Sequence, residues 1–188
     1  PAPWLSPRPL YVPMEVSYPF PPVEDYARVV GRFVGFGGKT LEQSGQYRIP
    51  AARTVVWDAL NDADVLQACI EGCESVTKLS DHRFDANITA KLGPVKTKFK
   101  ATIEVSDRNP PESYSLDVSV KGGMQGFGKG RAEVELAEDQ DATLLTYRVK
   151  GNVGGKLAQM GSRLITTAGR KMADGFFSKF SERWAGTI

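Results

Sequence analysis

The chain has 188 residues, of which 41% are hydrophobic, and a formal net charge of +2 at pH 7. These totals suit one globular domain and give no global electrostatic argument for nucleic-acid binding. Two cysteines and one histidine cannot form a standard four-ligand zinc site, and the lack of a secretory pattern or a long apolar stretch predicts a cytoplasmic protein without a membrane span.

Residues 1–40 are predicted to form an N-terminal arm, because prolines concentrate in residues 1–22 and favour an extended chain. A short amphipathic helix is predicted to start at Pro22 and to end at Gly35. Either this aromatic-rich arm docks on its own domain or on a second copy of the chain, which would give an oligomer, or it only packs against crystal neighbours.

From residue 41 the hydrophobic pattern changes to a period of two, which is typical of strands with one buried face. Two short helices are predicted between the first two strands, at 51–62 and 62–70. The dry face of the antiparallel sheet needs a cover, and a single helix over 154–184 is the only element long enough. The strands are predicted at 41–49, 73–79, 82–92, 95–107, 113–121, 124–137 and 142–153.

This order predicts an α+β helix-grip domain over 41–188, in which a curved antiparallel sheet wraps around a long C-terminal helix. Four segments resemble the CoxG family, whose members are described as the CoxG subunit of carbon monoxide dehydrogenase and belong to the SRPBCC, or START-like, superfamily. Glu71 departs from the family pattern, which usually has proline between the two cysteines. The segments are "GQYRIPAARTVVWDALNDADVLQACIEGCESV", "AKLGPVKTKFKATIEVSD", "FGKGRAEVEL" and "VGGKLAQMGSRLI", the last continued by "KMADGFFSKF" at 171–180.

The resemblance implies a cavity between the sheet and the long helix. It also implies association with a molybdenum hydroxylase such as aerobic CO dehydrogenase, recruitment of that enzyme to the inner face of the cytoplasmic membrane, and coupling to respiratory quinone. It implies no catalytic residues and no intrinsic cofactor, but a bound quinone or lipid.

The glycine-rich run "GGMQGFGKG" at 122–130 fits part of a phosphate-loop pattern, but Gly130 stands where Ser or Thr must bind magnesium, and a strand follows. Interpreted as a strand from residue 124, the run places glycines on the inner face. Either the helix backbone then comes close to that strand, or a cavity remains; the resemblance favours the cavity.

In the predicted long helix, Gly161, Ala168 and Gly175 recur every seven residues, in line with Leu157 and Leu164, and are predicted to form the roof of the site. Ordinary core packing is the alternative for each predicted lining residue. The predicted ligand-binding residues are Trp57, Leu92, Phe99, Met124, Gly126, Gly128, Tyr147, Leu157, Met160, Gly161, Leu164 and Ala168.

Lysines alternate with apolar residues along 91–100, so that Lys91, Lys96, Lys98 and Lys100 are predicted to face solvent. They either discourage edge pairing or bind anionic lipid or an acidic partner. Three aromatic residues, Phe177, Phe180 and Trp184, are predicted on the opposite face of the helix from its glycine line. They either tuck into the mouth of the sheet or against the arm, or contact a membrane or partner.

No motif places a nucleophile, and the single histidine, His82, is interpreted as a surface residue in a turn. The first functional hypothesis, which the resemblance implies, is a non-catalytic accessory protein with a bound quinone or lipid. The alternatives are a small helix-grip enzyme of the cyclase or hydrolase type acting on a hydrophobic substrate, and a structural adaptor without a pocket.

Overall fold

The computed structural model describes residues 39–92 and 95–184, except for the side chains at positions 92 and 95. The predicted arm lies outside the described residues apart from Lys39 and Thr40, which begin the first strand. Within these ranges, no helix is long and apolar enough to cross a membrane.

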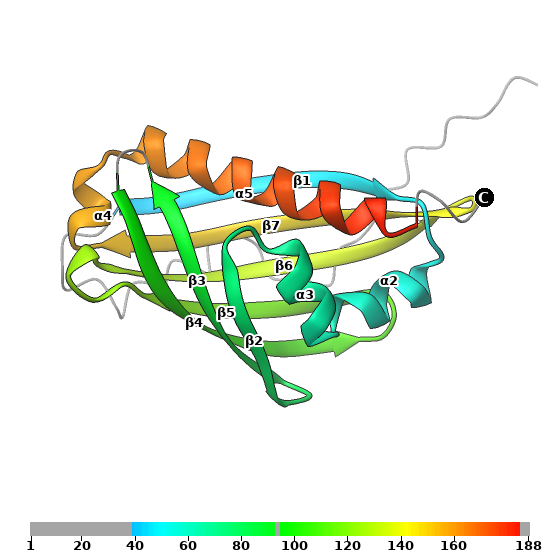
Figure 1. Cartoon of the computed structure of the whole chain (residues 1–188). Helices are drawn as coiled ribbons and strands as arrows, with labels where there is room; N and C mark the ends of the chain where they lie inside the picture. Colours follow the sequence, from blue (N-terminus) through cyan, green and yellow to red (C-terminus); the bar gives the residue numbers. More distant parts are fainter. Residues whose placement is uncertain (1–38, 93–94, 185–188) are drawn as a thin grey trace, which may run out of the picture. The chain divides into compact units, whose positions relative to one another are not determined.

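Over the described ranges, seven antiparallel strands form one curved sheet, as the period-two pattern predicted (Figure 1). The strand order is β1-β7-β6-β5-β4-β3-β2, so the first strand pairs with the last and all other neighbours are consecutive in the chain. The strands are β1 (Lys39–Ile49), β2 (Cys73–Ser80), β3 (Arg83–Leu92), β4 (Val95–Asn109), β5 (Ser113–Lys121), β6 (Phe127–Asp139) and β7 (Ala142–Gly154).

The two predicted short helices are present between β1 and β2, as α2 (Arg53–Leu60) and α3 (Ala63–Cys69). Asp62 caps α3, because its carboxylate accepts hydrogen bonds from the backbone N–H groups of Asp64, at 2.8 Å, and Val65, at 3.1 Å. The cap separates the two helices at the position where their predicted ranges met.

The prediction of one helix over 154–184 is wrong, because Gly161 interrupts it and Gly155 delays its start. A single turn, α4 (Lys156–Gln159), is followed by the long helix α5 (Ser162–Glu182). Gly155 and Gly161 precede these helices with φ of +68° and +89°, a region that glycine enters without a steric penalty. Gly161 therefore marks a helix boundary and carries no cost of an interior helical glycine.

The predicted core line of α5 is also wrong. An added Cβ at Gly175 would have one heavy atom within 4 Å, Glu71 Oε2 at 3.9 Å, while Gly161 stands outside the helix. Large apolar side chains determine the inner face instead, because they remove far more surface from water than small residues do. The residues of α5 and the turn after it that are buried or pack against buried clusters are Ile165, Ala173, Phe176, Phe177, Phe180 and Trp184.

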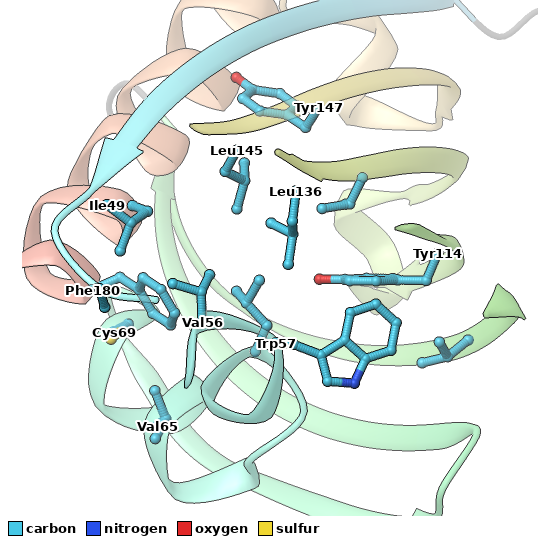
Figure 2. Packing of buried hydrophobic residues seen from close by; sticks show 14 of the residues in the cluster. Ile49, Val56, Trp57, Val65, Cys69, Tyr114, Leu136, Leu145, Tyr147 and Phe180 are labelled. Carbon is cyan, nitrogen blue, oxygen red and sulfur yellow. The ribbon is translucent and has the colours of Figure 1, made fainter. Parts of the chain in front are cut away.

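The larger core lies between the sheet, α2, α3 and the C-terminal half of α5 (Figure 2). Phe180 is at its centre with no exposed surface, and its ring lies 5.7 Å from that of Phe176 and 4.9 Å from that of Trp184. Phe177 stacks on Tyr47 with ring centroids 4.2 Å apart. A membrane or partner surface made of Phe177, Phe180 and Trp184 is therefore wrong: the helix end tucks into the sheet.

The strand β6 begins at Phe127, and not at residue 124, because Gly123–Gln125 form one turn of 3-10 helix. Met124 consequently lies at the tip of this turn with 85% of its surface exposed, so its prediction as an inner-face ligand contact is wrong. From residue 128 onward the predicted alternation holds, since Val134 and Leu136 are buried in the larger core.

Gly126 is explained by a close approach of two backbone segments. Its φ is +120°, and an added Cβ would clash with the carbonyl oxygen of Gly154. In return, a Cβ at Gly155 would lie 2.6 Å from the Gly126 Cα. The turn between β5 and β6 thus packs directly on the turn between β7 and α4, and Gly126 lines no cavity between the sheet and the long helix.

Gly126→Ala is expected to destabilise the fold by about 1–3 kcal/mol through strained backbone dihedrals, and further through the clash with Gly154. Gly123→Ala is the matched control, because Gly123 also has a positive φ, +57°, but nothing lies within 4 Å of its added Cβ. Chemical denaturation of both variants measures the difference. Equal stability of the two would contradict the close approach.

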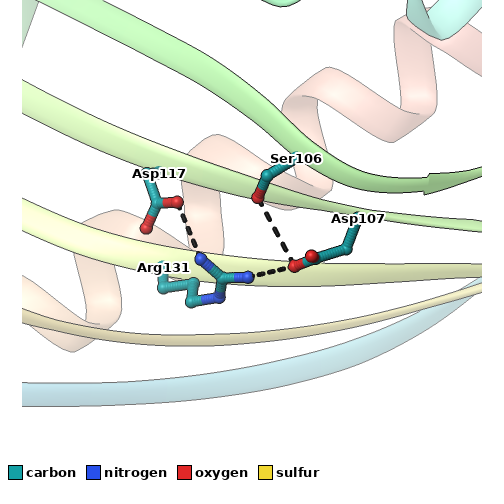
Figure 3. Close-up of polar contacts among 4 residues, drawn as sticks. All are labelled: Ser106, Asp107, Asp117 and Arg131. Atoms are coloured by element: carbon teal, nitrogen blue, oxygen red, sulfur yellow. Dashed lines mark hydrogen bonds and ion pairs between the residues drawn. The ribbon is translucent and has the colours of Figure 1, made fainter. Parts of the chain in front are cut away.

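The outer face of the sheet is braced across three strands by Arg131 of β6 (Figure 3). Its guanidinium binds Asp117 of β5 at 2.7 Å and also pairs with Asp107 of β4. Asp107 adopts a φ of +49° within the bulge of β4 between Ser106 and Asn109. The bulge therefore brings its carboxylate within reach of Arg131.

Candidate functional site

A second, smaller apolar cluster lies on the concave side of the sheet, at the end where α4 and α5 begin. Its buried members are Phe99 of β4, Leu157 of α4 and Ile165 of α5. An added Cβ at Gly122 would lie 2.5 Å from the Phe99 ring, so this ring lies against the β5–β6 turn. The partly buried hydrophobics packed against the cluster are Leu41, Ala90, Val120, Val153 and Met160.

Gly128 provides no side chain in the middle of this cluster. It pairs with Val120 on β5 and with Val153 on β7, both of which belong to the cluster. The three heavy atoms nearest to an added Cβ are Val153 Cγ1 at 3.7 Å, the Asn152 carbonyl oxygen at 3.8 Å and Val120 Cβ at 4.0 Å. All three belong to the sheet, so no close approach of the helix backbone fills this position.

Three of the predicted ligand-binding side chains, Phe99, Leu157 and Met160, come together at the smaller cluster, next to Gly128. Leu164 does not join them, because it is 38% exposed on the outer side of α5. Ala168 is half-buried on α5 and belongs to neither cluster. Leu92 ends β3, and its side chain lies outside the described residues.

Two predicted lining residues belong to the larger core instead. Trp57 of α2 meets the Tyr114 ring edge-on, with centroids 5.3 Å apart. Tyr147 of β7 lies over Gly45, where an added Cβ would be 2.7 Å from its ring. Trp57 packs at the end of the concave face opposite α4, and Tyr147 packs between the two ends. Ordinary core packing, the alternative considered for each residue, therefore explains both.

Sequence reasoning missed Ile165, Val120, Leu41 and Val153. The helix break explains Ile165, because restarting the helix at Ser162 turns this side chain inward in place of Leu164. The signal available in the sequence was Gly161 itself, because glycine readily adopts a positive φ and can separate one helix from the next, which begins at Ser162. The three strand residues required the pairing register, which places them around Gly128.

Polar side chains form one seam that ties β1 to α5 and to β7. The Tyr47 hydroxyl donates to Asp174 Oδ1 at 2.5 Å, and Gln43 Nε2 donates to the Tyr147 hydroxyl at 2.8 Å. Burial, followed by the hydrogen bond to Asp174, raises the pKa of Tyr47 well above its ordinary value. Gly169 lets the helix pass over this seam, because an added Cβ would lie 2.9 Å from Gln43 Oε1.

The described ranges contain no group of three or more His, Cys, Asp or Glu side chains that could hold a metal ion. His82 is exposed in the turn between β2 and β3, as predicted. Its backbone N–H donates to Ser80 Oγ at 3.2 Å. The chemistry of the concave face is thus that of an apolar site bordered by hydrogen-bonded tyrosines.

The predicted lysines lie on the outer face of β3 and β4 and are exposed, as the alternation predicted. Among these lysines, Lys98 forms an ion pair, because its ammonium group lies 2.9 Å from the carboxylate of Glu74. The hydrogen bond from Lys98 lowers the pKa of the Glu74 carboxyl below its usual value. Lys91 stands directly opposite Lys96 in the β3–β4 register.

Solved structures of similar fold agree with the helix-grip architecture. A conserved protein from Geobacillus kaustophilus is 32% identical, with a TM-score of 0.72 over 77% of this chain and 95% of its own. A START superfamily protein from Mycobacterium smegmatis is 9% identical, with a TM-score of 0.59 over 78% and 97%. A Rhizobium loti protein is 16% identical, with a TM-score of 0.58 over 76% and 99%.

A comparison with curated proteins gave no match. The family model described as CoxG, a subunit of carbon monoxide dehydrogenase, matches residues 45–185, which is most of the chain and includes both apolar clusters except Leu41. The matched range agrees with the four segments that carried the resemblance. This chain therefore belongs to the CoxG family and has a START-like helix-grip fold.

Proposed function

We propose that this protein binds an apolar, quinone-like or lipid-like molecule at the smaller cluster and acts as a non-catalytic accessory of a molybdenum hydroxylase at the cytoplasmic membrane. The observation that carries the proposal is Gly128, a strand position without a side chain between two members of an apolar cluster. Ligand sites of this kind are mostly apolar, with few polar groups.

Carriage is a better match to the concave face than cyclase or hydrolase chemistry. The tyrosine hydroxyls closest to a catalytic arrangement, those of Tyr47 and Tyr147, are already bound by Asp174 and Gln43. A general acid or base must reach its substrate, whereas Tyr47 ties β1 to α5 and Tyr147 accepts a hydrogen bond from Gln43 within the sheet. The seam between α5 and β1 therefore supports a rigid wall beside an apolar ligand.

The test of the ligand is extraction of the purified full chain with organic solvent, followed by mass spectrometry. About one quinone or lipid molecule per chain is expected, against a mock purification from cells without the protein. If no hydrophobic molecule is recovered in stoichiometric amount, even after incubation with quinone-loaded vesicles, the ligand proposal is wrong.

The family description supports the choice of partner, because it names carbon monoxide dehydrogenase. The full chain is expected to co-elute with purified aerobic carbon monoxide dehydrogenase in size-exclusion chromatography. Separate elution at micromolar concentrations of both proteins would contradict this part and leave the ligand proposal standing.

A further inference from the structure

The strand register gathers several segments at one end of the sheet, beside α4 (Figure 1). Phe127 at the start of β6 pairs with Gly154 at the end of β7, and Lys39 at the start of β1 pairs with Val153. Lys100 of β4 pairs with Lys121 at the end of β5. The same end includes the β5–β6 turn, because Gly126 packs against Gly154.

This end is strongly basic although the whole chain carries a net charge of only +2. In residues 39–42, 89–92, 95–100, 119–130 and 150–163, the one acidic residue is Glu42, which pairs with Lys150 at 2.8 Å. Glu74 of the neighbouring β2 also pairs with Lys98, at 2.9 Å. We call these segments the basic end. Its basic residues are Lys39, Lys91, Lys96, Lys98, Lys100, Lys121, Lys129, Lys150, Lys156 and Arg163.

Like charges face each other at two places in this surface. Lys91 is directly opposite Lys96, and Lys100 is directly opposite Lys121, all on the outer face. Such cross-strand pairs destabilise a sheet, because the ammonium groups repel at short range. Arg131, elsewhere on the same outer face, is by contrast matched by two carboxylates.

Apolar side chains project from the same end. Met124 is 85% exposed at the tip of the β5–β6 turn, and Phe127 is 43% exposed on the outer face beside it. A hollow of about 370 Å³ adjoins Phe127, and Lys121 and Lys129 border it. Its lining residues are Ser119, Val120, Lys121, Gly123, Gly126, Phe127, Gly128 and Lys129.

We propose that the basic end, with Met124 and Phe127 at its tip, docks on an anionic phospholipid bilayer. The inference rests on the proposed membrane role and adds the surface that makes the contact. Lysines near an anionic surface attract it electrostatically, while exposed apolar side chains between them enter the interface. Gly128 lines this hollow and pairs with Val120 and Val153 of the smaller cluster, so the ligand site lies at the same end of the sheet as the docking surface.

The test is co-sedimentation of the full chain with vesicles of phosphatidylcholine alone and of phosphatidylcholine with phosphatidylglycerol at 7:3. Binding is expected only to the anionic vesicles and is expected to fall as salt screens the charges. Lys100→Gln/Lys121→Gln should weaken binding by roughly fivefold per lysine, about 25-fold in all. Lys171→Gln/Lys179→Gln on α5 is the control of equal charge change, with less than a twofold effect expected.

Met124→Ser tests the apolar tip and should weaken anionic-vesicle binding about fivefold, because the bound state loses a methionine side chain that is partly buried in the lipid interface. Met172→Ser, at a position that is 39% exposed on α5, is its control. The inference is overturned if each variant and its control lose equal binding, or if neutral vesicles bind as well as anionic ones. It is also overturned if the chain binds no vesicles, and an acidic protein would then be the expected partner of the basic end.

Ligand recovery by mass spectrometry separates this inference from the proposed function. Docking variants that keep their ligand but lose vesicle binding support the docking surface. A chain without ligand that still binds anionic vesicles supports docking and contradicts the ligand proposal. If the chain retains its ligand but binds neither vesicle type, the docking surface is wrong and the ligand proposal stands.

Discussion

Phe180→Ala is expected to lower the free energy of unfolding by about 3–5 kcal/mol, the usual cost of removing a buried phenylalanine ring. Phe180 has no exposed surface, and its ring contacts the aromatic groups of Phe176 and Trp184. The cavity would open between α5 and the sheet, next to Ile49 and Val56 (Figure 2). A domain is stable by only about 5–15 kcal/mol, so this loss is a large fraction of the total.

Equilibrium denaturation with urea measures the change, with Met172→Ala on the same helix as the control. Met172 is 39% exposed, so its truncation should change stability by less than about 1 kcal/mol. A small effect of Phe180→Ala, comparable with the control, would mean that the C-terminal part of α5 does not pack into the sheet. The aromatic residues would then be free for an external contact.

The sheet could be predicted from the sequence because its signal is local. Alternating apolar and polar residues fix which face of a strand is buried, and turn residues such as Asn109-Pro110 separate consecutive strands. The exposure of Lys96, Lys98 and Lys100 follows from the same alternation. The prediction of β6 was wrong at its start, because a glycine-rich segment carries too few side chains to show a period.

The long helix was predicted with the wrong inner face for a different reason. Residues at helical spacing share a face only within one unbroken helix, and the positive φ of Gly161 breaks the helix at that point. Gly161 then falls outside the helix that carries Ala168 and Gly175, whereas Ile165, Phe176 and Phe180 share one face of α5. Small residues at helical spacing were weaker evidence than large apolar ones, since burial of the latter contributes more free energy.

The candidate site could be predicted only in part, because it depends on contacts between distant segments. Phe99, Leu157 and Met160 were predicted from strand and helix pattern, and they meet at the smaller cluster. Trp57 and Tyr147 satisfy the same patterns but pack in the larger core. Nothing in local periodicity distinguishes the two clusters, and the register of β5, β6 and β7 is what separates them.

Gly128→Leu is expected to abolish most binding of the apolar ligand, with a loss on the order of a hundredfold in affinity. An added Cβ at Gly128 makes only ordinary contacts, the nearest at 3.7 Å, so the strand accepts a side chain without backbone strain. The rest of the leucine would then occupy the space between Val120 and Val153. A ligand that must compete with this leucine for the apolar site loses about 3 kcal/mol of binding free energy, which corresponds to the expected hundredfold loss of affinity.

Titration with a short-chain quinone, followed by calorimetry, measures the affinity, and thermal unfolding confirms that the variant is folded. Gly128→Ala provides the smaller step of the same series and should weaken binding only a few-fold. Thr102→Leu adds the same side chain on the outer face of β4 and should leave affinity unchanged. Full affinity in a folded Gly128→Leu protein would place the ligand elsewhere, since no molecule can share the space that the new side chain fills.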